Sequence, residues 1–156
     1  LRVSGIYSND SIIPLALNKG VDLNAHDING VTPLMYAVRQ RQPVLVKKYL
    51  DFGAKVDTQD NTGKTALHYS VNCDTTGYLT QILLDRKANT GIQDNAGDTA
   101  LMAAIDAGHL KAVKTLFSKN PELINIKNKK GITPLDFSIE KKHLFITEFL
   151  KEQGAK

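Results

Sequence analysis

Gly30-Val31-Thr32-Pro33-Leu34-Met35 is the stretch that decides the fold, because edited copies of it recur along the chain. Its Thr-x-Leu core returns at Thr65, Thr99 and Thr133, at intervals of 33, 34 and 34 residues. The glycines that precede these threonines are Gly30, Gly63, Gly97 and Gly131, and the residues three positions earlier are Asp27, Asp60, Asp94 and Asn128. A fixed period of about 33 residues predicts a repeat array. Such an array acts through a surface, so the search is for a face rather than for a catalytic pocket.

The first complete copy shows what each unit should form. Asp27–Gly30 has the composition of a tight turn, since Asn-Gly favours a left-handed backbone. Thr32 is placed to cap a helix whose first residue is a proline, and we expect that helix to end near Gln40. Pro43 then opens a second helix, and Gly53 ends it in a left-handed conformation. Each copy is therefore predicted to be a turn followed by two short helices and a loop.

The apolar residues of each copy recur at helical spacing and must face inward. Helices shorter than about 12–15 residues are marginal in water, so each copy has to pack on its neighbours. Stacking of this kind gives an all-α solenoid, with a stability that sums repeat and interface terms. The predicted core includes Leu34, Ala37 and Val38, then Leu101, Ala104, Ile105, Val113 and Leu116, and in the last copy Leu135, Ile139, Ile146, Phe149 and Leu150.

These residues resemble the ankyrin repeat, which has the same period and a Thr-Pro-Leu-His-x-Ala signature. The resemblance covers the whole chain and implies a single ankyrin-repeat domain over residues 1–156. The expected copies are a partial N-terminal one over 1–26, full ones over 27–59, 60–93 and 94–127, and a C-terminal capping copy over 128–156. The partial copy has an apolar edge that includes Leu1, Val3 and Ile6, so we expect residues upstream to be missing or this edge to pack on something else.

Some departures from the repeat pattern affect the loops. Lys87 stands where Gly53 stands in the first full copy, so a left-handed backbone is expected there at a cost of about 1–2 kcal/mol. Asn120 takes the same place in the third copy and should tolerate that conformation better. One-residue insertions near Asp74–Tyr78 and Pro121–Ile124 are expected to lie in loops, where added length costs little.

The histidines and the cysteine do not form a catalytic or metal-binding pattern. His68, His109 and His143 occupy places set by the repeat, which favours structural roles, and His26 has no evident partner. A tetrahedral metal site needs clustered ligands, whereas the one cysteine, Cys73, should lie on a different helical face from His68. A Cys–His nucleophile pair is not expected for the same reason. The sequence predicts no catalytic residue, no cofactor, no metal and no enzyme.

The ankyrin resemblance implies that partners meet the turn tips and the exposed side of the first helices, which form one concave face. The first two copies supply Ile28, Asn29, Val31, Arg39 and Gln40, then Asn61, Thr62, Lys64, Asn72 and Cys73. The last two copies supply Asn95, Ala96, Asp98, Asp106 and Ala107, then Lys129, Lys130, Ile132, Glu140 and Lys141.

This face changes in character along the chain. Ile28 and Val31 are apolar residues at a turn that should be wet, which suggests contact with a partner. The last tip is basic, and residues 111–156 hold ten lysines and five acids. That basic end either serves solubility alone or attracts an acidic segment of a partner protein. Nucleic acid is not expected, because no aromatic residue and no arginine lies within Lys127–Lys130.

The sequence thus favours a non-catalytic protein–protein interaction module that binds a partner protein on its concave face. The alternative is the targeting or substrate-recruiting part of a larger protein, such as a bacterial effector or an enzyme. No stretch approaches the roughly 18 apolar residues that would cross a membrane. One cysteine excludes an internal disulfide and favours a cytoplasmic or other intracellular location. Because the chain starts at Leu1 without Met, we expect a processed or trimmed product with any targeting peptide out of view.

Overall fold

The computed structural model describes residues 22–155, which form eight α-helices and one 3-10 helix. In chain order these are α2 (Pro33–Arg39), α3 (Pro43–Asp51), α4 (Ala66–Cys73), α5 (Tyr78–Asp85), α6 (Ala100–Asp106), α7 (Leu110–Lys119), η1 (Pro121–Asn125), α8 (Pro134–Glu140) and α9 (Leu144–Glu152). The partial copy expected over residues 1–26, with its apolar edge, lies almost entirely outside the described residues.

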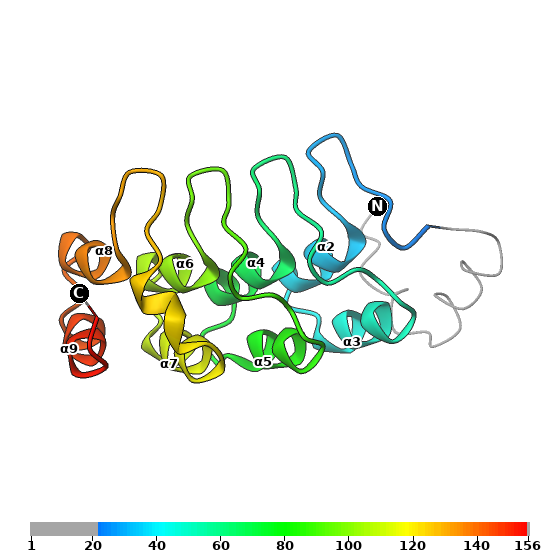
Figure 1. The fold of residues 1–156 in the computed structure, drawn as a ribbon. Coiled ribbons are helices and arrows are strands. Elements are labelled where there is room, and N and C mark those ends of the chain that lie inside the picture. Colours follow the sequence, from blue (N-terminus) through cyan, green and yellow to red (C-terminus); the bar gives the residue numbers. More distant parts are fainter. Residues whose placement is uncertain (1–21, 156) are drawn as a thin grey trace.

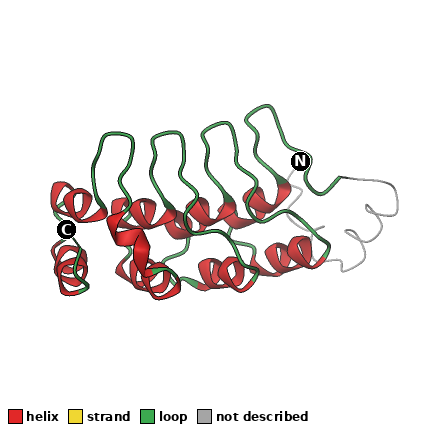
Figure 2. Ribbon diagram, in the orientation of Figure 1, coloured by secondary structure: helices red, strands yellow, loops and turns green. Residues whose placement is uncertain are grey.

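The helices are arranged in two rows, with a row of turns beside them (Figure 1). The first helices of successive copies, α2, α4, α6 and α8, lie side by side, and α3, α5, α7 and α9 form the second row. Loops connect the helices, and the described residues contain no strand beyond an isolated bridge between Gln93 and Thr99 (Figure 2). The predicted all-α solenoid of helix-turn-helix repeats is confirmed.

Local sequence explains where the helices begin and end. The hydroxyls of Thr32 and Thr133 accept the backbone N–H of Met35 and Asp136 at 3.3 and 3.1 Å, and each threonine is followed by a proline at the first helical position. These bonds satisfy backbone donors that a helix N-terminus leaves free. In the second full copy, Lys87 follows the end of α5 and adopts φ 61°, as expected for a residue in the place of Gly53.

The core runs as a continuous strip between the two rows. The central apolar residue of the first helices is fully buried at Val38, Val71 and Ile105, because the next copy covers it. Leu83, Leu116 and Leu150 of the second helices are also buried completely. Each copy therefore completes the hydrophobic core of its neighbours, as short helices require.

The end of the stack differs from the prediction. Ile139 was expected in the core but is 52% exposed, since among the described residues no further copy packs against α8 to cover it. Lys141, Lys142, Glu148, Lys151 and Glu152 are exposed, as a polar cap requires. Leu144 and Phe145 are nevertheless 78% and 77% exposed, so the last copy presents an apolar surface as well as its charges.

The loop of the third copy also corrects the prediction. Asn120 is extended, with φ −149°, and not left-handed. The following Pro121 disfavours a helical backbone at Asn120. The carboxamide oxygen of Asn120 accepts the N–H of Glu122 and caps η1, so Pro121–Ile124 form a 3-10 turn rather than a plain loop.

Candidate functional site

The turn of each copy is held by one Asp or Asn side chain. Oδ1 of Asp27 accepts the backbone N–H groups of Asn29 and Val31 at 2.8 and 2.9 Å. In the last copy Oδ1 of Asn128 does the same for Lys130 and Ile132. Asp60 and Asp94 repeat the pattern in the two middle copies. The residues that recur along the chain are thus occupied in building the turns.

Neighbouring turns are joined through their backbones. The N–H of Asn61 donates to the carbonyl oxygen of Asn29 at 2.9 Å, and the N–H of Lys129 donates to that of Ala96 at 3.1 Å. The turns approach so closely that a Cβ at Gly97 would lie 2.5 Å from the backbone nitrogen of Lys129. Gly97 also has φ 84°, which side chains disfavour. The turn tips therefore form an ordered row rather than independent loops.

Two tyrosines tie the first helices to these turns. The hydroxyl of Tyr36 donates to Oδ2 of Asp27 at 2.7 Å, which holds the pKa of Asp27 below its usual value. The hydroxyl of Tyr69 donates to Oδ2 of Asp60 in the same way. Burial and this bond raise the pKa of Tyr69 to about 12. Burial by itself would raise the pKa of Asp60, but the hydrogen bonds from Thr62, Tyr69 and the backbone lower it.

Two histidines, His68 and His109, contact neighbouring copies, which agrees with the structural roles that their places in the repeat favour. Nε2 of the buried His68 lies 3.2 Å from the carbonyl oxygen of Asp98, and burial lowers the pKa of His68. Nδ1 of His109 lies 2.7 Å from the carbonyl oxygen of Val71. His26 is exposed, with its Nδ1 3.3 Å from the carbonyl oxygen of Asp27.

No arrangement of reactive groups for catalysis is visible in residues 22–155. The thiol of Cys73 is half-buried, donates to the carbonyl oxygen of Val38, and has a pKa raised by burial, which disfavours a nucleophilic thiolate. Within the same span, His, Cys, Asp and Glu side chains form no group that could hold a metal ion. None of the helices described is both long and apolar enough to cross a membrane.

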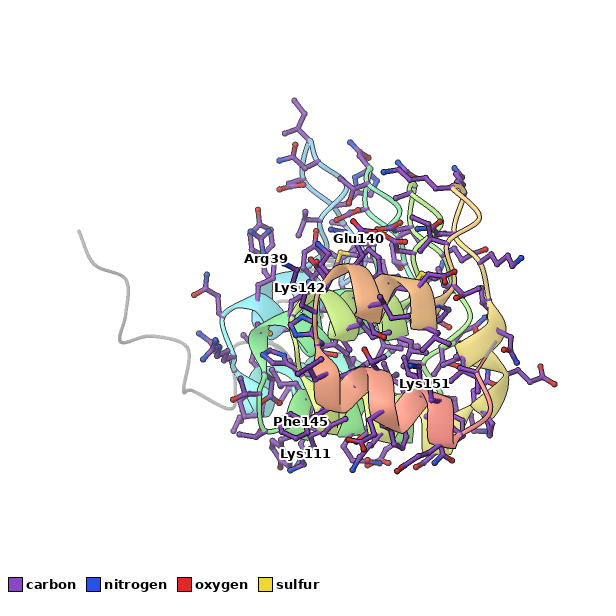
Figure 3. All side chains as sticks on the ribbon, turned by 90° about the vertical axis from the view of Figure 1, so that its left-hand side faces the viewer. Arg39, Lys111, Glu140, Lys142, Phe145 and Lys151 are labelled. Carbon is purple, nitrogen blue, oxygen red and sulfur yellow. The ribbon has the colours of Figure 1, made fainter. Side chains whose placement is uncertain are left out.

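The structure brings most of the predicted contact residues to one side. We use the name variable face for the accessible residues at the turn tips and on the first helices. Its exposed predicted members are Ile28, Asn29, Arg39, Gln40, Asn61, Thr62, Asn72, Asn95, Ala96, Asp106, Lys129, Lys130, Glu140 and Lys141. Half-buried members are Lys64, Cys73, Asp98, Ala107 and Ile132. In the end-on view, Arg39, Glu140 and Lys142 lie on the side where the first helices end, and Lys151 lies on the opposite side (Figure 3).

Val31 is the exception among the predicted contact residues. It was expected to be wet, but it is only 5% exposed and packs in the hydrophobic core. Its side chain cannot offer an apolar contact, so Val31 does not belong to the variable face. Ile28, three residues earlier at the turn tip, is 92% exposed and remains a candidate.

Sequence reasoning missed an aromatic position on the variable face. The residue four positions after each recurring threonine is Tyr36, Tyr69, Ala103 or Phe137, and each is at least partly accessible. The recurrence of aromatic residues at one repeat position was the signal that could have identified them. The guanidinium of Arg39 stacks near two of these rings, with its central carbon 5.8 Å from the centre of Tyr36 and 5.4 Å from that of Tyr69.

Charged groups of the last two copies are paired across the copy boundary. Nζ of Lys141 lies 2.5 Å from Oδ1 of Asp106, which raises the pKa of Lys141, and it also lies 5.1 Å from the centre of the Phe137 ring. Asp98 accepts a hydrogen bond from the side chain of Asn128 at 2.9 Å. Asp98, Asp106 and Lys141 of the variable face are therefore partly engaged by side chains of the neighbouring copy.

Comparison with known proteins gives matches over nearly all of the chain. A family model described as "Ankyrin repeats (3 copies)" matches residues 3–79 and again residues 75–156. YahD of Escherichia coli (strain K12), whose name describes an ankyrin repeat protein, is 32% identical over 149 residues, which are 92% of this chain and 73% of YahD. The Neurogenic locus Notch protein of Drosophila melanogaster is 39% identical over 80 residues, which are 51% of this chain.

A third relative, the Saccharomyces uvarum protein AKR2, is named as a palmitoyltransferase. It is 43% identical over 51 residues, or 33% of this chain. The match spans only 7% of AKR2, and the match to Notch spans only 3% of that protein. The chain thus covers most of YahD but a small part of the other two relatives.

Proposed function

Because the chain belongs to the ankyrin-repeat family, whose repeats are generally protein–protein interaction modules, we propose that it binds a partner protein through the variable face and catalyses no reaction. In this proposal the variable face takes the role of the concave face that the resemblance implies.

One observation carries this proposal. A single position near the end of each first helix is filled by Arg39, Asn72, Asp106 and Glu140, and all four side chains are exposed. The residues that recur unchanged, such as Thr65 and Leu67, are buried and support the fold. Exposed differences on a constant scaffold are what a binding surface needs for specificity. The ordered row of turns also limits the ordering cost of association.

The partner is proposed to carry an acidic segment over the last copy. Lys129 and Lys130 are exposed at that turn tip, and no carboxylate among the described residues forms an ion pair with either. Lys141 contributes less, since Asp106 already neutralises it. Exposed lysines of this kind attract acidic partners and speed association, with an effect that salt weakens.

Site-specific photo-crosslinking tests the proposed function. A photoreactive amino acid would replace Gln40, Asn72 or Ala107 on the variable face, or Gln81 or Ser118 on the second helices as controls, in lysate of the source cell. We expect the variable-face positions to cross-link one common polypeptide and the control positions not to cross-link it. Cross-links to that polypeptide from Gln81 and Ser118 alone would contradict the proposal.

A further inference from the structure

Arg39 is held in place by two anchored aromatic rings from different copies. Tyr36 comes from α2 and Tyr69 from α4, and the guanidinium carbon lies within 5.8 Å of both ring centres. Each ring is fixed in turn, because the Tyr36 and Tyr69 hydroxyls donate to Asp27 and Asp60. The Arg39 head group is thus ordered before any partner arrives, although its side chain is exposed.

The carboxylates of this part of the surface are occupied elsewhere. Asp27 and Asp60 accept backbone N–H groups of their own turns in addition to the tyrosine hydroxyls. Asp74 accepts the N–H groups of Thr76 and Leu79. Among residues 22–155 no carboxylate forms an ion pair with Arg39. Arg41 is also exposed, so the surface around Arg39 favours a negatively charged partner.

The equivalent position in the third copy shows the contrast. Asp106 occupies the place of Arg39 and forms an ion pair with Lys141 of the next copy at 2.5 Å. The charge at this position is therefore neutralised within the array in one copy and left available in another. An unneutralised arginine between tyrosines has the composition of an interface hot spot, in which Arg and Tyr are enriched.

The chemistry of the Arg39 guanidinium narrows the class of ligand that it can bind. A guanidinium that stacks on ring faces keeps the N–H groups at its edge free, and their planar fork matches the two oxygens of a carboxylate. We infer that Arg39, flanked by Tyr36 and Tyr69, is the anchor that receives an aspartate or glutamate side chain of the partner protein. This inference rests on the proposed function, and it names a second acidic contact far from Lys129 and Lys130.

Peptide selection followed by a double-mutant cycle tests the anchor. A random-peptide display library would be selected on the intact protein, and the tightest peptide would be synthesised with each Asp or Glu changed in turn to Asn or Gln. Binding would be measured to the wild type and to Arg39→Gln, Arg39→Lys, Lys129→Gln and Lys130→Gln on the variable face. Arg86→Gln, on the second-helix side, would serve as the control. Circular dichroism would confirm that each variant is folded.

We expect one acidic residue of the peptide to be coupled to Arg39. Losing either partner should weaken binding about tenfold or more, and losing both should cost little further. Arg39→Lys should lose most of the affinity because it lacks the planar fork, and Arg86→Gln should bind as the wild type does.

Three results would overturn the inference. Peptides without a required acid, or with an acid coupled to Lys129 or Lys130 instead, would sink the Arg39 anchor and leave the proposed function standing. A strong preference for a phosphoserine in place of the acid would assign the anchor to phosphopeptides instead. Peptides insensitive to every variable-face substitution would remove both proposals.

Discussion

The imidazole Nε2 of His68 lies 3.2 Å from the carbonyl oxygen of Asp98 in the next copy. The Nδ1 atom of the same ring accepts the backbone N–H of Thr65, 3.2 Å away. One buried side chain therefore joins the start of a helix to the neighbouring turn. In the third copy Met102 holds the equivalent place, and the buried hydroxyl of Thr99 has no hydrogen-bond partner among the described residues.

Met102→His should stabilise the protein. The new ring can accept from Thr99 and reach the backbone of the last turn, so we expect the free energy of unfolding to rise by about 1 kcal/mol. Urea denaturation would measure the change. His68→Met is the matched control and should lower the free energy of unfolding by a similar or larger amount. A destabilised Met102→His protein would show that packing of the methionine outweighs the missing bonds.

His68 should make stability depend on mildly acidic pH. Burial lowers the pKa of folded His68 below the unfolded value of about 6.5, so protonation favours the unfolded chain. The contribution of the neutral ring is complete above that value and is lost as pH falls through the folded pKa. Between pH about 7 and about 5 the wild type should therefore lose more stability than His68→Gln. Parallel pH profiles would refute this reading.

The local signals explain why much of the fold could be predicted. Thr32 and Gly53 act on their own backbone, so the caps and turns followed from neighbouring residues alone. Ile139 could not be placed in this way, because its burial depends on a following copy that would cover it. Val31 likewise lies in the core through contacts that the turn sequence does not reveal. The left-handed backbone predicted for Asn120 was wrong because the neighbouring Pro121 outweighed the repeat pattern.

The candidate face was only partly predictable. The repeat register located Arg39 and Lys129, but register does not show which side chains meet across copies. Tyr69 reaches Arg39 from the next copy, and Lys141 reaches Asp106 in the same way. Such contacts depend on the distance between stacked copies, which the spacing of motifs along the chain does not give.

The carboxylate of Asp60 should stabilise the fold more than a carboxamide at the same position would. Asp60→Asn keeps an oxygen for the turn N–H groups, as Asn128 does, but leaves the Tyr69 hydroxyl without its acceptor. Asp60→Ala loses the bonds to the turn N–H groups as well as the bond to the tyrosine. We therefore expect it to lower the free energy of unfolding by about 1–3 kcal/mol more than Asp60→Asn does. Equal losses in urea denaturation would show that the tyrosine bond alone matters.

The Asp60 carboxylate should also make the stability of the protein depend on pH in acid. The folded pKa of Asp60 is lowered, so its contribution is present above its unfolded pKa of about 3.9 and is lost as pH falls through the folded value. Asp60→Asn should therefore show a weaker loss of stability below pH about 4 than the wild type. An unchanged acid profile would contradict the assignment.

Lys87→Gly should relieve backbone strain. Lys87 has φ 61° at a place where Gly53 has φ 90°, and a left-handed backbone costs a side chain about 1–2 kcal/mol. Part of this gain is offset by the greater freedom of glycine in the unfolded chain, so we expect a net gain of about 0.5–1 kcal/mol in thermal or urea unfolding. Ser118→Gly, within α7, should instead lower stability by about 0.5–1 kcal/mol.

The affinity for the cross-linked partner tests the central claim, that the variable face carries recognition. Two sets of alanine substitutions would be compared, each at one repeat position. The sets are Arg39, Asn72, Asp106 and Glu140 on the first helices, and Lys47, Gln81, Lys114 and Glu148 on the second helices. We predict a loss of about tenfold or more for the first set, with no loss for the second. Wild-type affinity in a folded first-set variant, with loss in the second, would contradict the account.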